Sequence, residues 1–153
     1  MAQLKSILLA EDNSKDVELT LTALAEHNLA NEVIVARDGE EALDYLLRRG
    51  RFRERPEENP AVVLLDLKMP RVDGLEVLRR IKSEDRLKTI PVVMLTSSRE
   101  ERDLIESYRL GINAYVVKPV GFEQFVEAVR QIGVFWAILN ERAPGAVRKA
   151  AGP

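Results

Sequence analysis

The sequence predicts an α/β domain in which helices cover both faces of a parallel β-sheet. Two observations lead to this prediction: five short apolar runs recur along the 153 residues, and segments with helical spacing of apolar residues lie between them. Continuous runs rich in valine and isoleucine are typical of strands that are buried on both faces. Because connections between parallel strands are right-handed, the alternation places helices on both sides of the sheet.

The expected strands are the apolar runs themselves. They are ILLA (7–10), VIV (33–35), VVLL (62–65), VVML (92–95) and YVV (115–117). A helix is expected after each run, because apolar residues recur there at intervals of three or four, as on a helix face that packs against a core. These stripes are Val17, Leu21 and Leu24; Leu43, Leu46 and Leu47; Leu75, Leu78 and Ile81; Leu104, Ile105 and Tyr108; and Phe122, Phe125, Val126, Val129, Ile132 and Trp136.

Two segments do not fit the short connections of such a domain. Residues 49–60, RGRFRERPEENP, form a long polar insertion before the third strand. Its arginines are mixed with glutamates, which favours a solvated loop over a docking site for a partner. Residues 142–153 are rich in proline, glycine and alanine and predict a frayed tail. The expected organisation is therefore one domain over residues 1–141 and a flexible tail over 142–153.

The composition excludes several classes of function. With no cysteine, the chain cannot form disulfides, thiolate nucleophiles or cysteine-ligated zinc sites. His27 is the single histidine, so two-histidine metal sites are excluded, and its late position in a helical pattern favours a structural role. A net charge of −2 gives no basic field for nucleic acid. No signal peptide and no apolar run of about 20 residues is found, so we expect a cytoplasmic protein without membrane contact.

Polar residues follow four of the five expected strands. Ligands of doubly wound sheets bind beyond the carboxyl ends of the strands, which makes these positions the candidate site. They are Glu11 and Asp12 after the first strand, Asp66 after the third, Thr96, Ser97 and Ser98 after the fourth, and Lys118 and Pro119 after the fifth.

Three acids at one rim require a compensating positive charge. Two carboxylates about 4 Å apart repel by about 4 kcal/mol at an effective dielectric constant near 20. Lys118 supplies one positive charge, and a divalent cation is the natural second. Ligand sets made only of oxygen suit Mg²⁺, whereas zinc or copper would require imidazole or thiolate.

The segments LLAEDN, LLDLKMPRVDG, VVMLTSS and AYVVKP resemble the signature segments of the receiver domain of two-component response regulators. They occur in the expected order, each at a strand end, and the resemblance covers the chain to about Asn140. It implies a flavodoxin-like (βα)5 fold, a doubly wound parallel sheet with strand order 2-1-3-4-5. It also implies that a sensor histidine kinase transfers a phosphoryl group to an aspartate of this chain.

The resemblance assigns a role to each matching position at the strand ends. Asp66 corresponds to the phosphoacceptor, and Glu11 and Asp12 correspond to the acidic pair that holds Mg²⁺. Asp66 itself and the backbone carbonyl of Lys68 complete the implied metal ligands. Lys118 corresponds to the lysine that, with the metal, offsets the charge of the phosphoryl group.

The same resemblance implies a conformational switch. Thr96 corresponds to the hydroxyl residue that moves toward the phosphoryl group, and Tyr115 to the aromatic residue whose orientation follows. Pro119 corresponds to the residue after a peptide bond that is usually cis. Lys68 and Ser98 would flank the path of attacking water, which leaves the lifetime of the phosphoryl bond open.

A narrower resemblance concerns the regulators paired with bacterial phytochromes. It rests on the long 49–60 insertion and on the aromatic residues of an extended last helix. It implies a stand-alone receiver that serves a bacteriophytochrome kinase. Exposed aromatic residues at a domain edge also suggest a homodimer, with Phe135, Trp136 and Leu139 at the interface.

Two other classes of function remain as alternatives. A magnesium-dependent phosphatase with an aspartyl nucleophile would use a second acid two residues after the nucleophile, where this chain has Lys68. A flavodoxin-type redox carrier would need a glycine- and hydroxyl-rich phosphate loop after the first strand, where this chain has AEDNSKD. We therefore expect a protein that catalyses only its own phosphorylation and dephosphorylation.

Overall fold

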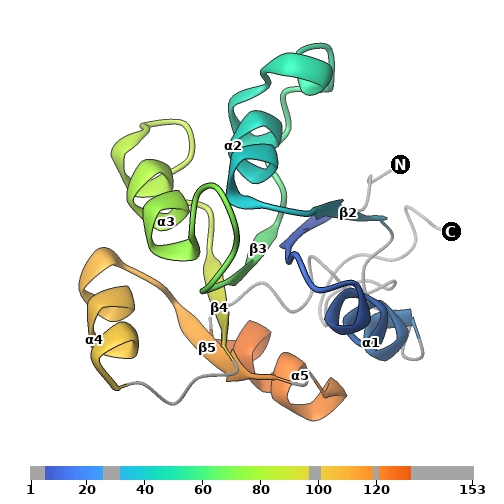
Figure 1. Cartoon of the computed structure of the whole chain (residues 1–153), viewed down its shortest axis with the longest axis vertical. Helices are drawn as coiled ribbons and strands as arrows, with labels where there is room; N and C mark the ends of the chain where they lie inside the picture. Colours follow the sequence, from blue (N-terminus) through green and yellow to red (C-terminus); the bar gives the residue numbers. More distant parts are fainter. Residues whose placement is uncertain (1–5, 26–31, 97–100, 119–120, 132–153) are drawn as a thin grey trace, which may run out of the picture.

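Five parallel strands form one sheet in the computed structural model (Figure 1). The strands are β1 (Ser6–Ala10), β2 (Glu32–Ala36), β3 (Val62–Asp66), β4 (Val92–Thr96) and β5 (Ala114–Val117). Their order is β2-β1-β3-β4-β5, which confirms the predicted flavodoxin-like topology. The structure describes residues 6–25, 32–96, 101–118 and 121–131, and for residues 96, 101–104, 122 and 129–131 it describes the backbone without the side chain.

Alternate residues of each central strand enter two separate hydrophobic cores. In β1, Leu8 and Ala10 pack into one core, while Ile7 and Leu9 pack into the other, as side chains of a strand alternate between faces. In β3, Val62 to Leu65 are fully buried. Both faces of the sheet are covered, so the central strands are apolar without interruption, which is why these runs stand out in the sequence.

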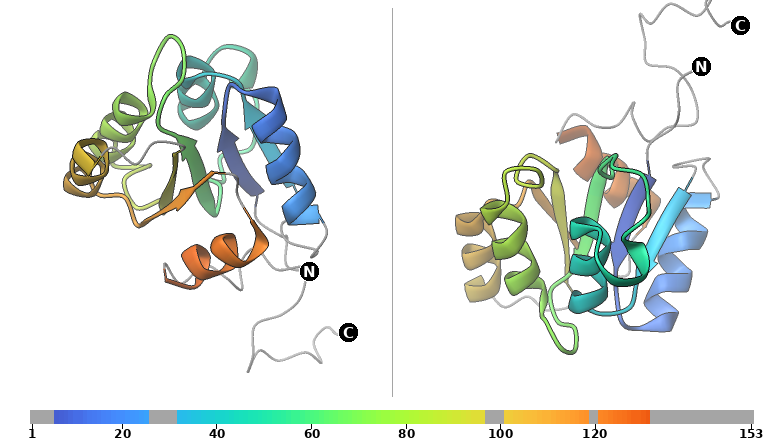
Figure 2. Two further views of the ribbon diagram at one scale, coloured as in Figure 1. Left: turned by 60° about the horizontal axis from the view of Figure 1, so that its bottom comes forward. Right: turned by 90° about the horizontal axis from the view of Figure 1, so that it is seen from above.

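Helices cover the two faces in unequal numbers (Figures 1 and 2). The helices are α1 (Ser14–Ala25), α2 (Gly39–Leu47), α3 (Gly74–Ser83), α4 (Glu101–Leu110) and α5 (Phe122–Gln131). The core of one face contains buried residues of α2 and α3, with Leu110 of α4 at its margin. The core of the other face contains residues of α1 and α5, including Phe125, which is fully buried. All five predicted helices are present, and the predicted extension of the fifth beyond Gln131 lies outside the described residues.

Side chains that precede three of the helices fix where each begins. Asn13 Oδ1 accepts a hydrogen bond from the backbone N–H of Asp16 at 3.0 Å, before α1. Asp38 and Asp73 accept in the same way at the starts of α2 and α3. Such caps satisfy N–H groups that have no partner inside the helix. They hold the first turns of the helices next to the strand ends, where the candidate site lies.

The insertion before β3 is largely exposed, as predicted, but it is anchored through Arg55. A short 3₁₀ helix, η1 (Gly50–Phe52), begins the insertion, and the ring of Phe52 packs edge-on against Tyr45, with the centroids 5.1 Å apart. The guanidinium of Arg55 lies 4.2 Å from the centroid of Tyr45 and donates to the carbonyl oxygen of Tyr45 at 2.6 Å. Arg55 also donates to the carbonyl of Leu46, so it satisfies two carbonyls at the end of α2.

The prediction that the apolar stripe of the fourth helix faces the core is wrong for Ile105 and Tyr108. Ile105 and Tyr108 are 54% and 50% exposed, whereas Ser107 is fully buried. The helix packs at the β5 edge of the sheet. There α3 contacts one side of α4, and its other side faces solvent. Only part of its apolar surface is therefore covered, and the buried side chain among residues 105–110 is the polar Ser107. Tyr108 instead meets Tyr115 edge-on, with the ring centroids 6.3 Å apart.

Several sequence predictions lie outside the described residues. They concern His27, Ser97, Ser98, Pro119, the interface residues Phe135, Trp136 and Leu139, and the tail 142–153. Within the described part of the chain, no helix combines the length and the apolarity needed to span a bilayer.

Candidate functional site

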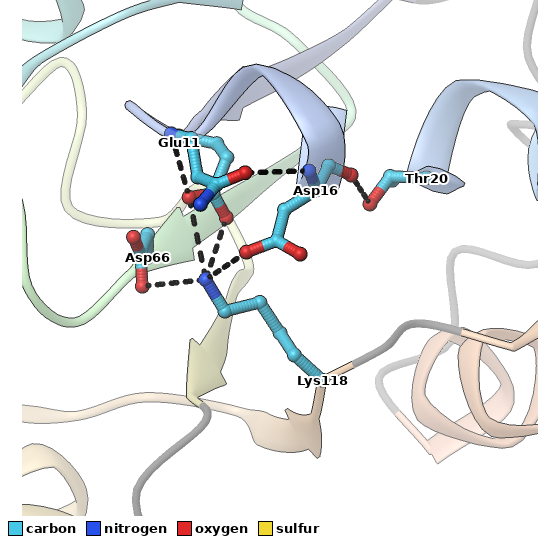
Figure 3. A network of polar contacts seen from close by, with 6 residues as sticks. Glu11, Asp16, Thr20, Asp66 and Lys118 are labelled. Carbon is cyan, nitrogen blue, oxygen red and sulfur yellow. Dashed lines mark hydrogen bonds and ion pairs between the residues drawn. The ribbon is translucent and has the colours of Figure 1, made fainter. Parts of the chain in front are cut away.

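The candidate site is formed where strands β1, β3 and β5 end (Figure 3). Parallel strands bring their carboxyl ends to the same edge of the sheet, and β1 and β3 are direct neighbours in it. Glu11 follows β1, Asp66 ends β3, and Lys118 follows β5. The side chains of these three residues converge although they are separated by many residues in sequence.

Three carboxylates form an acidic cluster at this edge. One oxygen each from Glu11, Asp12 and Asp66 lies within 4.8 Å of the others. Glu11 is 1% exposed and Asp66 is 5% exposed, while Asp12 is open to solvent. An all-oxygen set with an open side fits a hard divalent cation that keeps some of its water. The structure thus brings together the three acids that the sequence pointed to.

The ammonium group of Lys118 lies among the acids. Its Nζ atom donates to both carboxylate oxygens of Glu11, at 3.0 and 3.3 Å. It also donates to Asp16 Oδ2 at 2.9 Å and forms an ion pair with Asp66 Oδ1 at 3.4 Å. The side chain of Lys118 is only 9% exposed, so these charged contacts are largely shielded from water.

Burial and the neighbouring charges shift the pKa values of Asp66 and Lys118. Burial, followed by a hydrogen bond with Glu11 and the charge of Glu11, raises the pKa of Asp66 from 3.8 to about 7, although Lys118 acts in the opposite direction. For Lys118, burial alone would lower the pKa, but hydrogen bonds to Asp16 and Glu11 and the charges of Asp66 and Glu11 raise it. Lys118 therefore stays charged, and by itself it does not compensate the acidic cluster.

Asp16 is the residue of this network that the sequence analysis missed as part of the site. Its sequence context, EDNSKD, is typical of the capping residues at the start of a helix. In the structure Asp16 is in the first turn of α1, and its side chain makes the shortest contact of the Lys118 ammonium. The available signal was its place in the first turn of the helix that follows the β1 end, four residues after Asp12.

The remaining predicted residues occupy the expected positions in the chain. Thr96 is the last residue of β4 and pairs in register with Val117, but its side chain lies outside the described part. Lys68 is exposed in the loop after Asp66. Tyr115 of β5 is 42% exposed and points away from the core, where it meets Tyr108.

The loop after Asp66 is held tightly against the start of α3. The backbone N–H of Gly74 donates to the carbonyl oxygen of Leu67 at 2.8 Å. A Cβ atom at position 74 would lie 2.3 Å from the carbonyl oxygen of Asp66 and 2.9 Å from Cα of Leu67. The close approach explains the need for glycine in RVDG, and it fixes the backbone next to the Asp66 carboxylate.

Comparison with known proteins identifies the family of this chain. The family model described as the response regulator receiver domain matches residues 7–130. The chain belongs to the response regulator receiver family. The response regulator Rcp1 of Synechocystis sp. is 40% identical over 132 residues, which cover 86% of this chain and 88% of Rcp1.

Solved structures of receivers are also similar over nearly the whole chain. The bacteriophytochrome response regulator RtBRR is 63% identical with a TM-score of 0.83, covering 94% of this chain and 86% of RtBRR. The bacteriophytochrome response regulator AtBRR is 65% identical with a TM-score of 0.83, covering 92% of this chain and all of AtBRR. The Mn²⁺-bound form of Rcp1 is 38% identical with a TM-score of 0.73, covering 92% of this chain and 99% of that one. Family membership favours a receiver over both alternatives, the phosphatase and the flavodoxin-type carrier.

Proposed function

We propose that this receiver accepts a phosphoryl group from a sensor histidine kinase onto Asp66 and uses it to change its affinity for a partner. One observation carries the proposal. The Asp66 carboxylate ends a buried strand, 3.4 Å from the Lys118 ammonium and beside the carboxylates of Glu11 and Asp12. A nucleophile, a fixed positive charge and a set of metal ligands therefore meet at one point.

The residues of this chain supply the parts that phosphoryl transfer needs. An oxygen of Asp66 forms a bond to phosphorus as the bond from phosphorus to the kinase histidine breaks, and the histidine nitrogen keeps the electron pair. The Lys118 ammonium offsets negative charge on the phosphoryl oxygens. The loop fixed by Gly74 keeps the attacking oxygen in place, which lowers the entropic cost of the reaction.

A magnesium ion fits the residues present. Glu11, Asp12 and Asp66 would hold it, and the backbone carbonyl of Lys68 is the further ligand that the family resemblance implies. When bound, Mg²⁺ would neutralise the acids and the incoming phosphoryl oxygens. The similar regulator Rcp1 has a solved structure in a Mn²⁺-bound form, and Mn²⁺ has a similar ligand preference.

Labelling with a small phosphodonor tests the proposal. Wild-type protein, Asp66→Asn and Asp85→Asn are incubated with phosphoramidate, with magnesium or with EDTA, and a labile adduct is measured by intact mass. The Asp85 side chain is 94% exposed and serves as a matched control. We expect an adduct on wild type and on Asp85→Asn, only with magnesium. Labelling of Asp66→Asn at the wild-type rate would overturn the assignment.

The proposed output is a switch that involves Thr96 and Tyr115. The Thr96 hydroxyl would donate to a phosphoryl oxygen, and Tyr115, which is exposed in this structure, would move toward the vacated space. The surface of α4 and β5 would change as a result. Thr96→Ala is expected to accept the phosphoryl group but to lose the change in partner affinity. Equal affinity of wild type before and after phosphorylation would refute the switch.

We further propose that the cognate kinase is a bacteriophytochrome. The support is the identity of 63% and 65% to two regulators named for that class of photoreceptor. Phosphotransfer from a bacteriophytochrome kinase should be much faster than from an unrelated histidine kinase of equal autophosphorylation. Equal transfer rates from the two kinases would remove this part of the proposal.

Three further expectations belong to the proposed function. The receiver acts in the cytoplasm, catalyses only its own phosphorylation and dephosphorylation, and forms a homodimer through Phe135, Trp136 and Leu139. The dimer is tested by light scattering of wild type and Trp136→Ala, with and without phosphodonor. A monomeric mass of wild type at micromolar concentration in both conditions would contradict the dimer.

A further inference from the structure

We infer that Asp16 is a positioning residue that competes with the phosphoryl group for the Lys118 ammonium. The inference rests on the proposed phosphorylation of Asp66 and deepens it. It starts from the contacts of Lys118 Nζ, which has three N–H donors to share. Three acids receive them in this structure: Glu11, Asp16 and Asp66.

The contact to Asp16 is shorter than the contact to Asp66. Lys118 Nζ lies 2.9 Å from Asp16 Oδ2 and 3.4 Å from Asp66 Oδ1. Figure 3 shows Asp16 and Asp66 on opposite sides of the ammonium group, with Glu11 between them. A charge-assisted hydrogen bond at 2.9 Å is a strong one, whereas 3.4 Å leaves an ion pair without a good hydrogen bond. The resting ammonium is therefore held toward α1 and away from the phosphoacceptor.

The position of Asp16 is itself fixed by its helix. Its backbone N–H donates to Asn13 Oδ1 at 3.0 Å, and its carbonyl oxygen accepts from the Thr20 hydroxyl at 2.8 Å. Thr20 is 2% exposed, so this turn of α1 packs against the protein interior. Both bonds fix the backbone of Asp16, so its short side chain stays at this turn of α1, and the longer Lys118 side chain is the group that moves.

Phosphorylation changes the balance between the two contacts. A phosphoryl group on Asp66 adds negative charge and acceptor oxygens on the side of the ammonium away from Asp16. To bind those oxygens closely, Lys118 must lengthen or give up its contact with Asp16. Asp16 thus reduces the stabilisation that Lys118 gives to phosphoryl transfer, and it acts only through Lys118.

Asp16→Asn, Asp16→Glu and Glu18→Gln test this inference in the full-length protein. Asp16→Asn keeps the shape of the side chain but removes the charge that holds the ammonium. Asp16→Glu keeps the charge on a longer arm and should restore the contact. Glu18→Gln removes one charge from an exposed position of the same helix and controls for the general field of α1. The readout is the second-order rate constant of labelling by phosphoramidate in magnesium, together with the half-life of the adduct.

We expect Asp16→Asn to be labelled about fivefold faster than wild type, a difference of about 1 kcal/mol. The labelling rates of Asp16→Glu and Glu18→Gln should stay within about twofold of the wild-type rate, because both variants keep an acid at position 16 that binds the Lys118 ammonium. An Asp16→Asn rate equal to or below that of wild type would overturn the inference, as would an equal increase in Glu18→Gln. Absence of any adduct on wild type would instead refute the proposed function, so the two failures are distinguishable.

Discussion

Replacing Asp66 by asparagine is expected to stabilise the metal-free protein. The substitution keeps the shape of a side chain that is 5% exposed and removes its charge from a cluster with Glu11 and Asp12. Burial and Glu11 raise the pKa of Asp66 from 3.8 to about 7. At 1.36 kcal/mol per tenfold change in proton affinity, this difference corresponds to about 4 kcal/mol of unfolding free energy. Rearrangement around the charged form relieves part of this cost, so we expect a gain of about 2 kcal/mol.

The sign of the effect depends on pH in a defined way. The pKa of Asp66 is higher in the folded state than in the unfolded state, so the stability it contributes is present below 3.8 and is lost as the pH rises to about 7. The difference in unfolding free energy between Asp66→Asn and wild type should therefore be small at about pH 4 and reach its full value at about pH 8. Magnesium at about 100 times its dissociation constant should add about 2.7 kcal/mol to wild type and less to the variant.

Urea unfolding followed by far-UV circular dichroism measures this prediction. Wild type, Asp66→Asn and the exposed control Asp85→Asn are unfolded in EDTA across this pH range. The control should differ from wild type by less than about 0.5 kcal/mol. An Asp66→Asn protein that is no more stable than wild type at about pH 8 in EDTA would refute the electrostatic account of the cluster.

Substitutions at three other positions test parts of the same account by urea unfolding. Lys118→Met leaves Glu11, Asp16 and Asp66 without their shared cation and should lower the unfolding free energy by about 3–5 kcal/mol in EDTA, with part recovered in magnesium. The control Lys15→Met, at an exposed position, should change the unfolding free energy little. A loss below about 1 kcal/mol in Lys118→Met would contradict the importance of these ion pairs. Gly74→Ala places a Cβ atom 2.3 Å from the Asp66 carbonyl oxygen, so it should lower the unfolding free energy by about 2–3 kcal/mol and slow phosphoramidate labelling. Wild-type stability of this variant would contradict the tight packing of the loop. Arg55→Ala and Arg55→Lys should each lose about 1–2 kcal/mol of unfolding free energy, because the planar guanidinium of Arg55 donates to the carbonyls of both Tyr45 and Leu46. Arg53→Ala is the control and should be neutral. Wild-type stability of Arg55→Lys would contradict this role of the guanidinium.

The sheet and the positions of most candidate site residues could be predicted from the sequence for the same physical reason. Parallel strands that are buried on both faces are apolar without interruption, so their ends are marked by the first polar residue. Asp66 and Lys118 could be recognised in this way, because the carboxyl ends of such strands meet at one edge of the sheet. Chain order and strand ends are local properties of the sequence, and here they determine the geometry of the site.

Features that depend on how one element is rotated against another could not be predicted in this way. The apolar spacing of Ile105 and Tyr108 marks a helix, but it does not reveal that α4 lies at an edge where that face is uncovered. Asp16 is an ordinary first-turn acid until the distance to Lys118 across the fold is known. Arg55 stands among several arginines, and only the folded loop brings it to the end of α2.

Locating the phosphoryl group on the chain tests the assignment of Asp66 as phosphoacceptor most directly. Wild-type protein is labelled with phosphoramidate in magnesium, the acyl phosphate is reduced with borohydride, and the position converted to homoserine is identified by peptide mass spectrometry. The account predicts conversion at position 66, and none when EDTA replaces magnesium. Conversion at another acid, or conversion at position 66 that does not depend on a divalent cation, would contradict it.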